Sequence, residues 1–329
     1  MATGRTTTKK GTARRPAGRG AGDSVVILTG VCGRLGRLLL RQLHREGRVV
    51  GIDRREFIDA PPDLLQHHID LRRKACRDVF RRNPVRAVVH LGVMHDPRMS
   101  AETRHAWNVE GFGRILEYVA ALRIPKLVLL SSAAVYGARP ENAQFMLEDT
   151  PLLASGRVSE IRDLVELDML AQTFFWRAPD CETVILRPSF IVGEVHNEIY
   201  SYFRLPLAPK LLGFDPMMQF VHEDDVVQAL RLALRPGVRG IYNVGGPGVL
   251  PLSEVIARVG RPTAPVPHFL ARGLLDRLWR FGITDFPGRE IDYLRYVCMV
   301  DDRRARTELG YQPAKTLDET VAAIGESTA

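Results

Sequence analysis

The sequence lacks the features of a membrane protein, a disulfide-bonded protein and a zinc protein. Its four cysteines in 329 residues form no Cys-x-x-Cys pair, which argues against a disulfide framework or a zinc site and is typical of the reducing cytosol. No apolar run approaches the roughly 20 residues that span a bilayer, and the chain begins with no signal-peptide pattern. We therefore expect a cytoplasmic globular protein without a metal site or a transmembrane segment.

Tyrosine and lysine are both missing from the middle of the chain. Tyrosine is absent between Gly137 and Ile199, and lysine is absent between Leu127 and Pro209. Only six lysines stand against 40 arginines in the whole sequence. A catalytic site that needs a tyrosine and a lysine close together in this stretch is therefore excluded.

The net charge of +8 comes mainly from the first 23 residues, which carry six basic side chains and one acidic one. This tail contains no leucine, isoleucine or phenylalanine, so it lacks both a core and the amphipathic face of a transit peptide. We expect residues 1–23 to form a disordered basic tail, with binding of an acidic partner as the alternative. The rest of the chain carries only +3 and gives no indication of specific nucleic-acid binding.

After residue 23, short β-branched runs alternate with helical patterns, which is typical of βαβ units and a parallel sheet. The strands are expected at residues 25–29, 49–52, 66–69, 87–91, 126–130 and 183–186. The clearest helices are expected at residues 35–45 and 101–122. The predicted fold class is therefore α/β, with a Rossmann-like doubly wound parallel sheet.

Gly30, Gly33 and Gly36 follow the first expected strand at intervals of three and lead into the first helix. Glycine lets the backbone turn tightly and approach a pyrophosphate, which the free N–H groups and the dipole of the helix then bind. Asp53 ends the second strand, where a carboxylate accepts both hydroxyls of an adenosine ribose. The pattern predicts a dinucleotide site with NAD favoured over NADP, unless the two arginines after Asp53 hold a 2′-phosphate.

Further segments agree with one known pattern when they are taken in order. They are SVVILTGVCGRLG (24–36), VVHLGV (88–93), NVEGFGRILEYVA (108–120), SSAAVYG (131–137), LRPSFIVG (186–193), FVHEDDVVQAL (220–230), YNVGG (242–246) and RRARTELGYQP (303–313). Together they resemble the extended short-chain dehydrogenase/reductase superfamily, in its NAD-dependent epimerase/dehydratase family of UDP-glucose 4-epimerase-like proteins. The resemblance covers residues 24–325 and is specific as an ensemble.

The resemblance implies a domain organisation, a cofactor site and partners. Residues 24–187 would form the NAD-binding domain, and residues 188–329 mainly a smaller α/β substrate-binding domain that crosses back to the first. The implied partners are a small-molecule substrate, such as a nucleotide sugar, and a second copy in a homodimer. The implied cofactor-binding residues are Gly30, Gly33, Arg34, Leu35, Gly36, Asp53, Asp70, Leu71, Leu91, Gly92, Asn108 and Ser131.

In that family, a serine after the fifth strand acts with a Tyr-x-x-x-Lys pair, in which tyrosine is the general acid/base and lysine lowers its pKa. Ser132 matches the serine. Counting back from Asp168, which matches an acidic position of the family, places Glu160 at the tyrosine and Leu164 at the lysine. Glu160 is a candidate replacement base, because an apolar cleft raises the pKa of a carboxylate. The alternative is that Glu160 only solvates the start of a helix.

Other polar groups have a catalytic and a structural interpretation. His95 and Asp96 follow the fourth strand as candidate acid/base groups, although Asp-Pro is equally a turn signal. The run from His222 to Asp225 superficially suggests metal ligands. Its place before an apolar helix favours capping instead, with Asp224 or Asp225 accepting from free N–H groups.

Two segments are more hydrophobic than a nucleotide-sugar site requires, namely residues 199–218 and 268–281. The second places Phe269, Leu270, Leu274, Leu278 and Phe281 on a helical stripe with arginines between them. Such a stripe forms a membrane-surface helix or the wall of a lipid-sized pocket. The ordinary interpretation, which we favour, is that it belongs to the core.

Three functions follow from these patterns. The first is an NAD-dependent epimerase, dehydratase or dehydrogenase that transfers hydride at a carbinol carbon of a nucleotide sugar, with a degenerate catalytic motif. The second is a non-catalytic protein that binds or senses NAD(H). The third keeps the redox chemistry but acts on a lipid or sterol-like alcohol. Fold analogy alone does not choose among these substrates.

Overall fold

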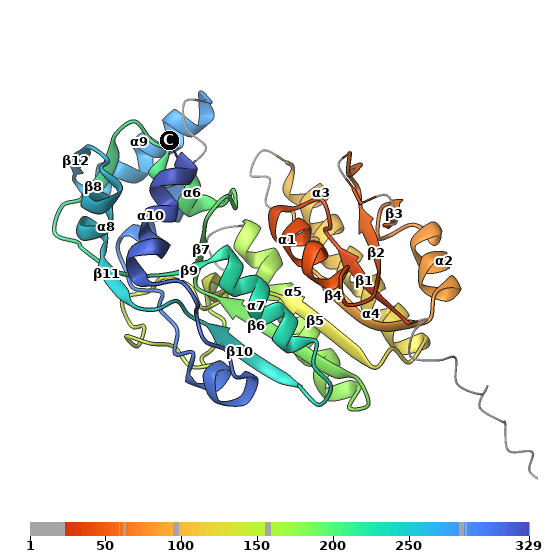
Figure 1. Cartoon of the computed structure of the whole chain (residues 1–329). Coiled ribbons are helices and arrows are strands. Elements are labelled where there is room, and N and C mark those ends of the chain that lie inside the picture. Colours follow the sequence, from red (N-terminus) through yellow and green to blue (C-terminus); the bar gives the residue numbers. More distant parts are fainter. Residues whose placement is uncertain are drawn as a thin grey trace, which may run out of the picture.

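The computed structural model describes residues 24–58, 60–61, 64–94, 99–154, 159–282, 286 and 288–328. The expected disordered tail, His95 and Asp96 lie outside this range. The largest element is a seven-stranded sheet with the order β10-β6-β5-β4-β1-β2-β3 (Figure 1). All neighbouring strands in it run parallel. Its strands are β1 (Val25–Thr29), β2 (Arg48–Asp53), β3 (Leu65–His68), β4 (Val85–His90), β5 (Lys126–Leu130), β6 (Glu182–Pro188) and β10 (Gly240–Val244).

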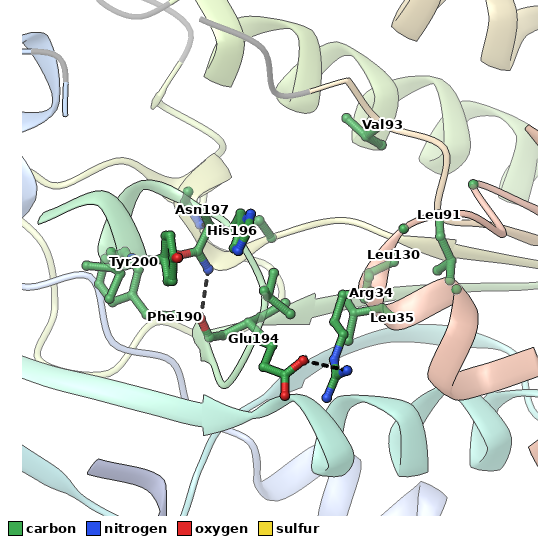
Figure 2. A pocket seen from close by; sticks show the side chains of 18 of the residues that line it. Arg34, Leu35, Leu91, Val93, Leu130, Phe190, Glu194, His196, Asn197 and Tyr200 are labelled. Carbon is green, nitrogen blue, oxygen red and sulfur yellow. Dashed lines mark hydrogen bonds and ion pairs between the residues drawn. The ribbon is translucent and has the colours of Figure 1, made fainter. Parts of the chain in front are cut away.

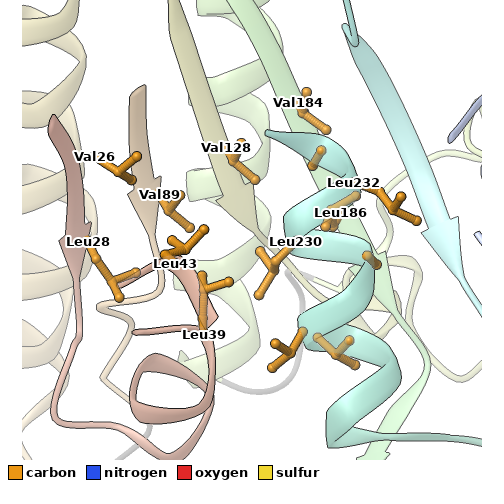
Figure 3. Close-up of a cluster of buried hydrophobic side chains, with 14 of the residues drawn as sticks. Val26, Leu28, Leu39, Leu43, Val89, Val128, Val184, Leu186, Leu230 and Leu232 are labelled. Atoms are coloured by element: carbon orange, nitrogen blue, oxygen red, sulfur yellow. The ribbon is translucent and has the colours of Figure 1, made fainter. Parts of the chain in front are cut away.

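Both faces of this sheet are covered by helices, which explains why its strands read as continuous hydrophobic runs. Val25 and Ile27 of β1 pack on one face against helices α2, α4 and α5. Val26 and Leu28 pack on the other against α1 and α7, as Figure 3 shows. The covering helices are α1 (Arg34–Leu43), α2 (Lys74–Arg82), α4 (Gly111–Ala121), α5 (Ser159–Arg177) and α7 (Glu223–Ala233). The predicted doubly wound α/β fold is confirmed.

The helix predicted at residues 101–122 is interrupted in the structure. It consists of α3 (Ala101–His105), a π-helical turn (Ala106–Glu110) and α4. The wider turn carries Asn108, whose side-chain amide donates to the carbonyl oxygen of Met94 and accepts from its N–H group, at 3.1 and 2.7 Å. The prediction of a helix here is confirmed, but the π-helical turn inside it was not predicted, because a periodic apolar pattern does not register an inserted residue.

The rest of the chain forms a smaller part beside the sheet (Figure 1). It contains a three-stranded sheet, β11-β9-β7, and a two-stranded sheet, β12-β8. Their strands are β7 (Phe190–Val192), β8 (Ala208–Leu211), β9 (Met217–His222), β11 (Val249–Pro251) and β12 (Thr263–Val266). The helices are α6 (Glu198–Phe203), α8 (Leu252–Val259), α9 (His268–Arg280) and α10 (Leu317–Thr328). In the described part of the chain, no helix combines the length and apolar character of a membrane span.

Helix α7 is closed by side chains at both ends. The imidazole Nδ1 of His222 accepts from the N–H group of Asp224 at 3.2 Å, so the predicted cap by Asp224 or Asp225 was wrong. Asp225 instead accepts from the N–H group of Ala314 at 2.7 Å. At the other end, the ammonium group of Lys126 donates to the carbonyl oxygens of Ala233, the last residue of the helix, and of Arg235 and Val238 beyond it, where a cation is stabilised by the helix dipole.

A buried ion pair joins α5 to the sheet. Arg187 of β6 donates to both carboxylate oxygens of Asp168 at 2.9 and 2.7 Å, and both side chains are almost fully buried. Arg187 also donates to the hydroxyl of Tyr136, which donates to Asn243 of β10. Ser131 donates to Asp168 at 2.6 Å. The network therefore fixes the end of β5 relative to α5, β6 and β10.

We predict that Arg187→Met destabilises the fold by about 3–5 kcal/mol, because it leaves the Asp168 carboxylate buried without its cation. A double variant that also carries Asp168→Leu should regain much of this loss. Urea unfolding monitored by circular dichroism measures both values.

The matched control is Arg114→Met, which removes an exposed ion pair with Glu117 at 2.9 Å. It should change the free energy of unfolding by only about 0.5 kcal/mol or less. A loss of equal size in the control, or a double variant as unstable as the single one, would contradict the assignment.

Candidate active site

A cavity of about 670 Å³ lies between the carboxyl ends of the parallel strands and the smaller part (Figure 2). This edge, where the strand order reverses between β1 and β4, is where doubly wound folds bind ligands. One wall is formed by Gly30, Gly33, Arg34, Leu35, Gly36, Leu91, Leu130, Ser131 and Ser132. The opposite wall includes Phe190, Glu194, His196, Asn197, Tyr200, Tyr293 and Leu294.

The three glycines of the turn have different reasons to be glycine. Gly30 has φ +75°, and a Cβ on it would lie 2.7 Å from the backbone nitrogen of Gly92. A Cβ on Gly36 would collide with the carbonyl oxygen of Gly30. Gly33 has an ordinary φ of −70°, and its closest contact would be 3.3 Å from that same oxygen. Gly30 and Gly36 are therefore required by the shape of the turn. Gly33 is not, and its lack of a side chain instead leaves space in the cavity beside the turn.

The start of α1 fits the pyrophosphate of a dinucleotide. Gly33 is the N-cap and offers no side-chain cap, and the first turn of the helix has no acidic residue. The free N–H groups and the positive end of the dipole therefore lie at the cavity wall. The Arg34 side chain is held aside by Glu223 and Glu194, each at 2.7 Å.

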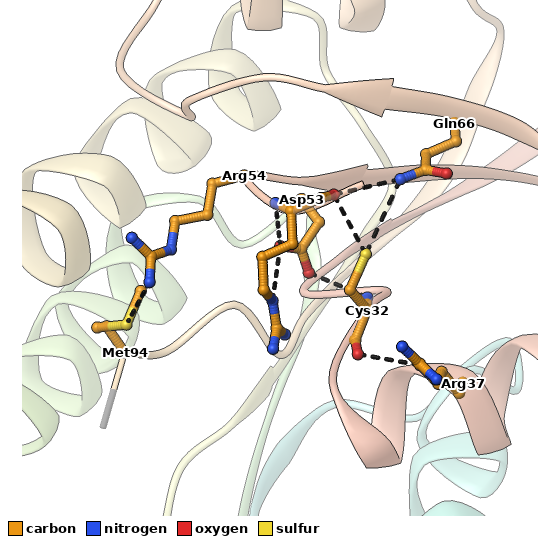
Figure 4. Close-up of polar contacts among 7 residues, drawn as sticks. Cys32, Arg37, Asp53, Arg54, Gln66 and Met94 are labelled. Atoms are coloured by element: carbon orange, nitrogen blue, oxygen red, sulfur yellow. Dashed lines mark hydrogen bonds and ion pairs between the residues drawn. The ribbon is translucent and has the colours of Figure 1, made fainter. Parts of the chain in front are cut away.

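Asp53 lies at the end of β2, beside the cavity rather than in its wall (Figure 4). Its carboxylate accepts from the N–H groups of Cys32 and Arg55 at 3.0 and 2.9 Å, and both of these residues line the cavity. Oδ1 also accepts from the Arg55 guanidinium at 3.4 Å, whereas Oδ2 has a further lone pair for a ribose hydroxyl. The Arg54 side chain turns away and donates to the sulfur of Met94 at 3.4 Å.

The other predicted cofactor residues separate into two groups. Leu91 and Ser131 join the residues of the glycine turn in the cavity wall, whereas Asp70, Leu71, Gly92 and Asn108 do not line it. Asp70 is paired with Arg72 at 2.7 Å, and that hydrogen bond lowers the pKa of the Asp70 carboxyl. The roles of all these residues toward a cofactor stay predictions.

The predicted catalytic region borders the cavity. The Ser132 hydroxyl accepts from the N–H group of Ala134 at 3.1 Å, which leaves its own hydrogen free to be donated into the cavity. Leu164, at the lysine position, is buried in the cavity wall together with Ile161. Glu160 belongs to the first turn of α5, and its side chain lies outside the described part of the structure.

Sequence reasoning missed Tyr293, which enters this region from the smaller part. Its hydroxyl donates to the carbonyl oxygen of Ala134 at 2.9 Å, across 159 residues of sequence, and its ring lines the cavity. No local motif signals such a contact. Tyr136 is excluded as an acid/base group by its surroundings, because burial raises its pKa to about 12 and its hydroxyl bonds Arg187 and Asn243. Among the described residues, no group of His, Cys, Asp and Glu side chains is placed to hold a metal ion.

Comparisons with known proteins agree with this architecture. The profile of the NAD-dependent epimerase/dehydratase family matches residues 26–245. An uncharacterized protein of Mycobacterium tuberculosis strain H37Rv is 30% identical over 310 residues, which cover 90% of this chain and 81% of that protein. The UDP-glucuronate 4-epimerase of Thermodesulfobacterium geofontis is 24% identical over 69% of this chain and 76% of its own. The structure of Thermus thermophilus UDP-glucose 4-epimerase with NAD superposes with a TM-score of 0.71, at 19% identity and coverage of 92% and 98%.

The fold and its glycine turn define a Rossmann-type dinucleotide-binding protein. The chain belongs to the NAD-dependent epimerase/dehydratase family, so the resemblance seen in the sequence is confirmed. The NAD dependence of this family confirms NAD as the predicted cofactor.

We predict that Gly33→Val abolishes NAD binding while the protein remains folded, because φ at Gly33 suits any residue and the added methyl groups enter the cavity. Fluorescence titration with NADH and a thermal melt measure the two properties. The control is Gly47→Val, since a Cβ on Gly47 meets no atom within 4 Å. Unchanged NADH affinity in Gly33→Val would mean that the pyrophosphate does not bind at this turn.

We also predict that Asp53→Ala lowers the affinity for NAD by about 10- to 100-fold, because hydrogen bonds to a charged group are lost. NADP should lose less affinity, because the same change removes a negative charge from the site of its 2′-phosphate. Arg54→Ala, whose side chain points to Met94, is the matched control and should change neither affinity much. Titration of each variant with NAD and with NADP measures these affinities. If Asp53→Ala lowers the affinity for both cofactors equally, Arg55 rather than Asp53 determines the preference between them.

Proposed function

We propose that this protein is an NAD-dependent oxidoreductase that transfers hydride at a carbinol carbon of a nucleotide sugar, with a degenerate catalytic motif. The observation that carries the proposal is a single cavity that joins the glycine turn to Ser132 beneath a wall from the smaller part. Relatives named as UDP-glucuronate and UDP-glucose 4-epimerases support a nucleotide sugar as the substrate class.

In this proposal, bound NAD supplies the hydride acceptor, and the residues of the chain do the rest. The turn around Gly33 and the start of α1 hold the pyrophosphate, and Asp53 accepts from the ribose. Ser132 donates a hydrogen bond to the substrate oxygen that loses its proton. Glu160 takes up that proton as a general base. Ile161 and Leu164 exclude water from the reacting carbon, which strengthens the hydrogen bond of the serine.

The second candidate is a protein that binds or senses NAD(H) without catalysis. The specific observation in its favour is the buried Leu164, because hydrocarbon stands where the family places a lysine. A leucine can neither hold a ribose nor lower the pKa of a neighbouring acid. Nothing in the glycine turn depends on that lysine, so the binding of NAD is compatible with both candidates.

The deciding experiment is to identify the nucleotide that denaturation releases from the purified protein, and then to follow absorbance at the NADH band with UDP-glucose and UDP-glucuronate. Accumulation of NADH, or isomerised sugar in the products, supports the oxidoreductase. Bound NAD with no spectral change and no product supports the binding protein.

We predict that Glu160→Tyr with Leu164→Lys raises turnover of a sugar nucleotide, because one positioned acid/base group contributes about 10²–10⁴-fold to a rate. The matched control, Glu117→Tyr with Leu122→Lys, introduces the same residues at exposed positions and should change nothing. A thermal melt checks folding, since the lysine replaces a buried side chain.

If a well-folded double variant is inert while the parent turns over an alcohol substrate, Glu160 or another group must serve as the base. If the parent and the variant both bind NAD and both stay inert, the non-catalytic candidate is correct.

A further inference from the structure

Helix α9 is apolar on two sides, and only one of them is buried. Ala271 and Leu275 pack into the smaller part. Leu270, Leu274 and Phe281 lie on a different side of the helix and are 55, 49 and 77% exposed. The interpretation of this stripe as core was therefore wrong.

Two further apolar side chains near the start of the helix are exposed. Phe269, the second residue of the helix, is 73% exposed, and Leu212, directly after β8, is 54% exposed. The N–H group of Leu212 donates to the carbonyl oxygen of Val266, which directly precedes the N-cap Pro267 of α9. We call the set of Leu212, Phe269, Leu270, Leu274 and Phe281 the α9 patch. Single exposed apolar residues are ordinary, but a group of five on neighbouring elements marks an interaction surface.

Helix α9 itself carries more basic than acidic residues. The helix carries Arg272, Arg277 and Arg280 against one acid, Asp276. The three arginines are exposed. Exposed phenylalanine and leucine beside exposed arginine is the composition of helices that lie in a membrane interface.

We propose that α9 docks this protein on the surface of an anionic lipid bilayer. The charge selects this occupant over a second copy of the chain, because two basic patches would repel each other whereas anionic headgroups neutralise the arginines. The apolar side chains would then enter the boundary between headgroups and acyl chains, and the helix would lie in the plane of the membrane. The proposal goes beyond the redox function and does not depend on it.

Docking would bring the cavity close to the bilayer. Helix α9 packs against the 3₁₀ turn Gly288–Leu294, and Tyr293 and Leu294 of this turn line the cavity. In Figure 1, α9 lies in the smaller part, away from the helices that flank β1 to β3. The seven-stranded sheet and its cofactor site would therefore remain in the aqueous phase.

The test is co-sedimentation of the full chain with vesicles of phosphatidylcholine alone and of phosphatidylcholine containing about 30% phosphatidylglycerol. We expect binding to the anionic vesicles that weakens as salt is added. Leu274→Ser with Phe281→Ser removes apolar contact without changing charge, and it should lower the partition coefficient by at least about 10-fold. Because both side chains are exposed, the variant should melt like the parent.

Two controls make the result specific. Phe145→Ser with Leu147→Ser replaces apolar residues that are 40 and 46% exposed elsewhere on the surface, and it should bind like the parent. Arg277→Gln with Arg280→Gln should reduce binding to anionic vesicles and leave any weak binding to neutral vesicles unchanged.

Three outcomes would overturn the proposal. One is no binding of the parent to anionic vesicles. Another is binding that Leu274→Ser with Phe281→Ser does not change, which would assign it to the basic residues 1–23. The third is a parent that sediments without lipid as a dimer that the same variant dissociates, which would make the α9 patch an interface between copies.

Discussion

The ion pair between Asp168 and Arg187 is the constraint on which the candidate site depends. It lies between α5 and β6, and through Ser131, Tyr136 and Asn243 it also fixes the end of β5 and the edge strand β10. Two buried charges are expensive unless both are fully hydrogen-bonded. Here the Asp168 carboxylate accepts hydrogen bonds from the Arg187 guanidinium, from Ser131 and from Gln172. Ser131 is held in this way, and so the adjacent Ser132 keeps its place in the cavity wall.

Ion pairs of Arg34 connect the two walls of the cavity. Arg34 begins α1, whereas its partners Glu223 and Glu194 belong to α7 and to the loop after β7. Gly193 allows this approach, because a Cβ on it would lie 2.7 Å from the carboxyl carbon of Glu223. The helix whose dipole faces the cavity is thus tied to the smaller part by the side chain of its first residue.

The sequence was sufficient to predict what depends on local pattern. The bounds of β1 and β5 agree with the prediction to the residue, because buried parallel strands read as uninterrupted apolar runs. The turn at Gly30, Gly33 and Gly36 was equally readable, since its spacing follows from backbone sterics. The amide of Asn108 bonding Met94 could not be predicted in this way, because the inserted residue of a π-helical turn leaves the apolar period almost unchanged.

The errors at α7 and α9 have a different physical origin. Asp224 and Asp225 have the right chemistry for a cap, but the helix begins at Glu223, so both lie in its first turn and His222 takes the N-cap position. The α9 stripe has the spacing of a core helix, yet periodicity states only that a side is apolar and not what covers it. In both cases the residue types indicated which interactions were chemically possible, and the tertiary structure determined which of them form.

Helix α5 lacks the tyrosine and lysine that the family uses for proton transfer. The inward side of α5 presents Ile161 and Leu164 to the cavity, and neither can exchange a proton. A group for proton transfer would then have to come from outside these two positions, and entry from the smaller part is one route. Tyr293 shows that such entry is sterically available, since its hydroxyl already lies 2.9 Å from the carbonyl oxygen of Ala134, two residues from Ser132. The glycine turn thus belongs to the first β-α-β unit, whereas Tyr293 of the smaller part reaches the cavity near Ser132.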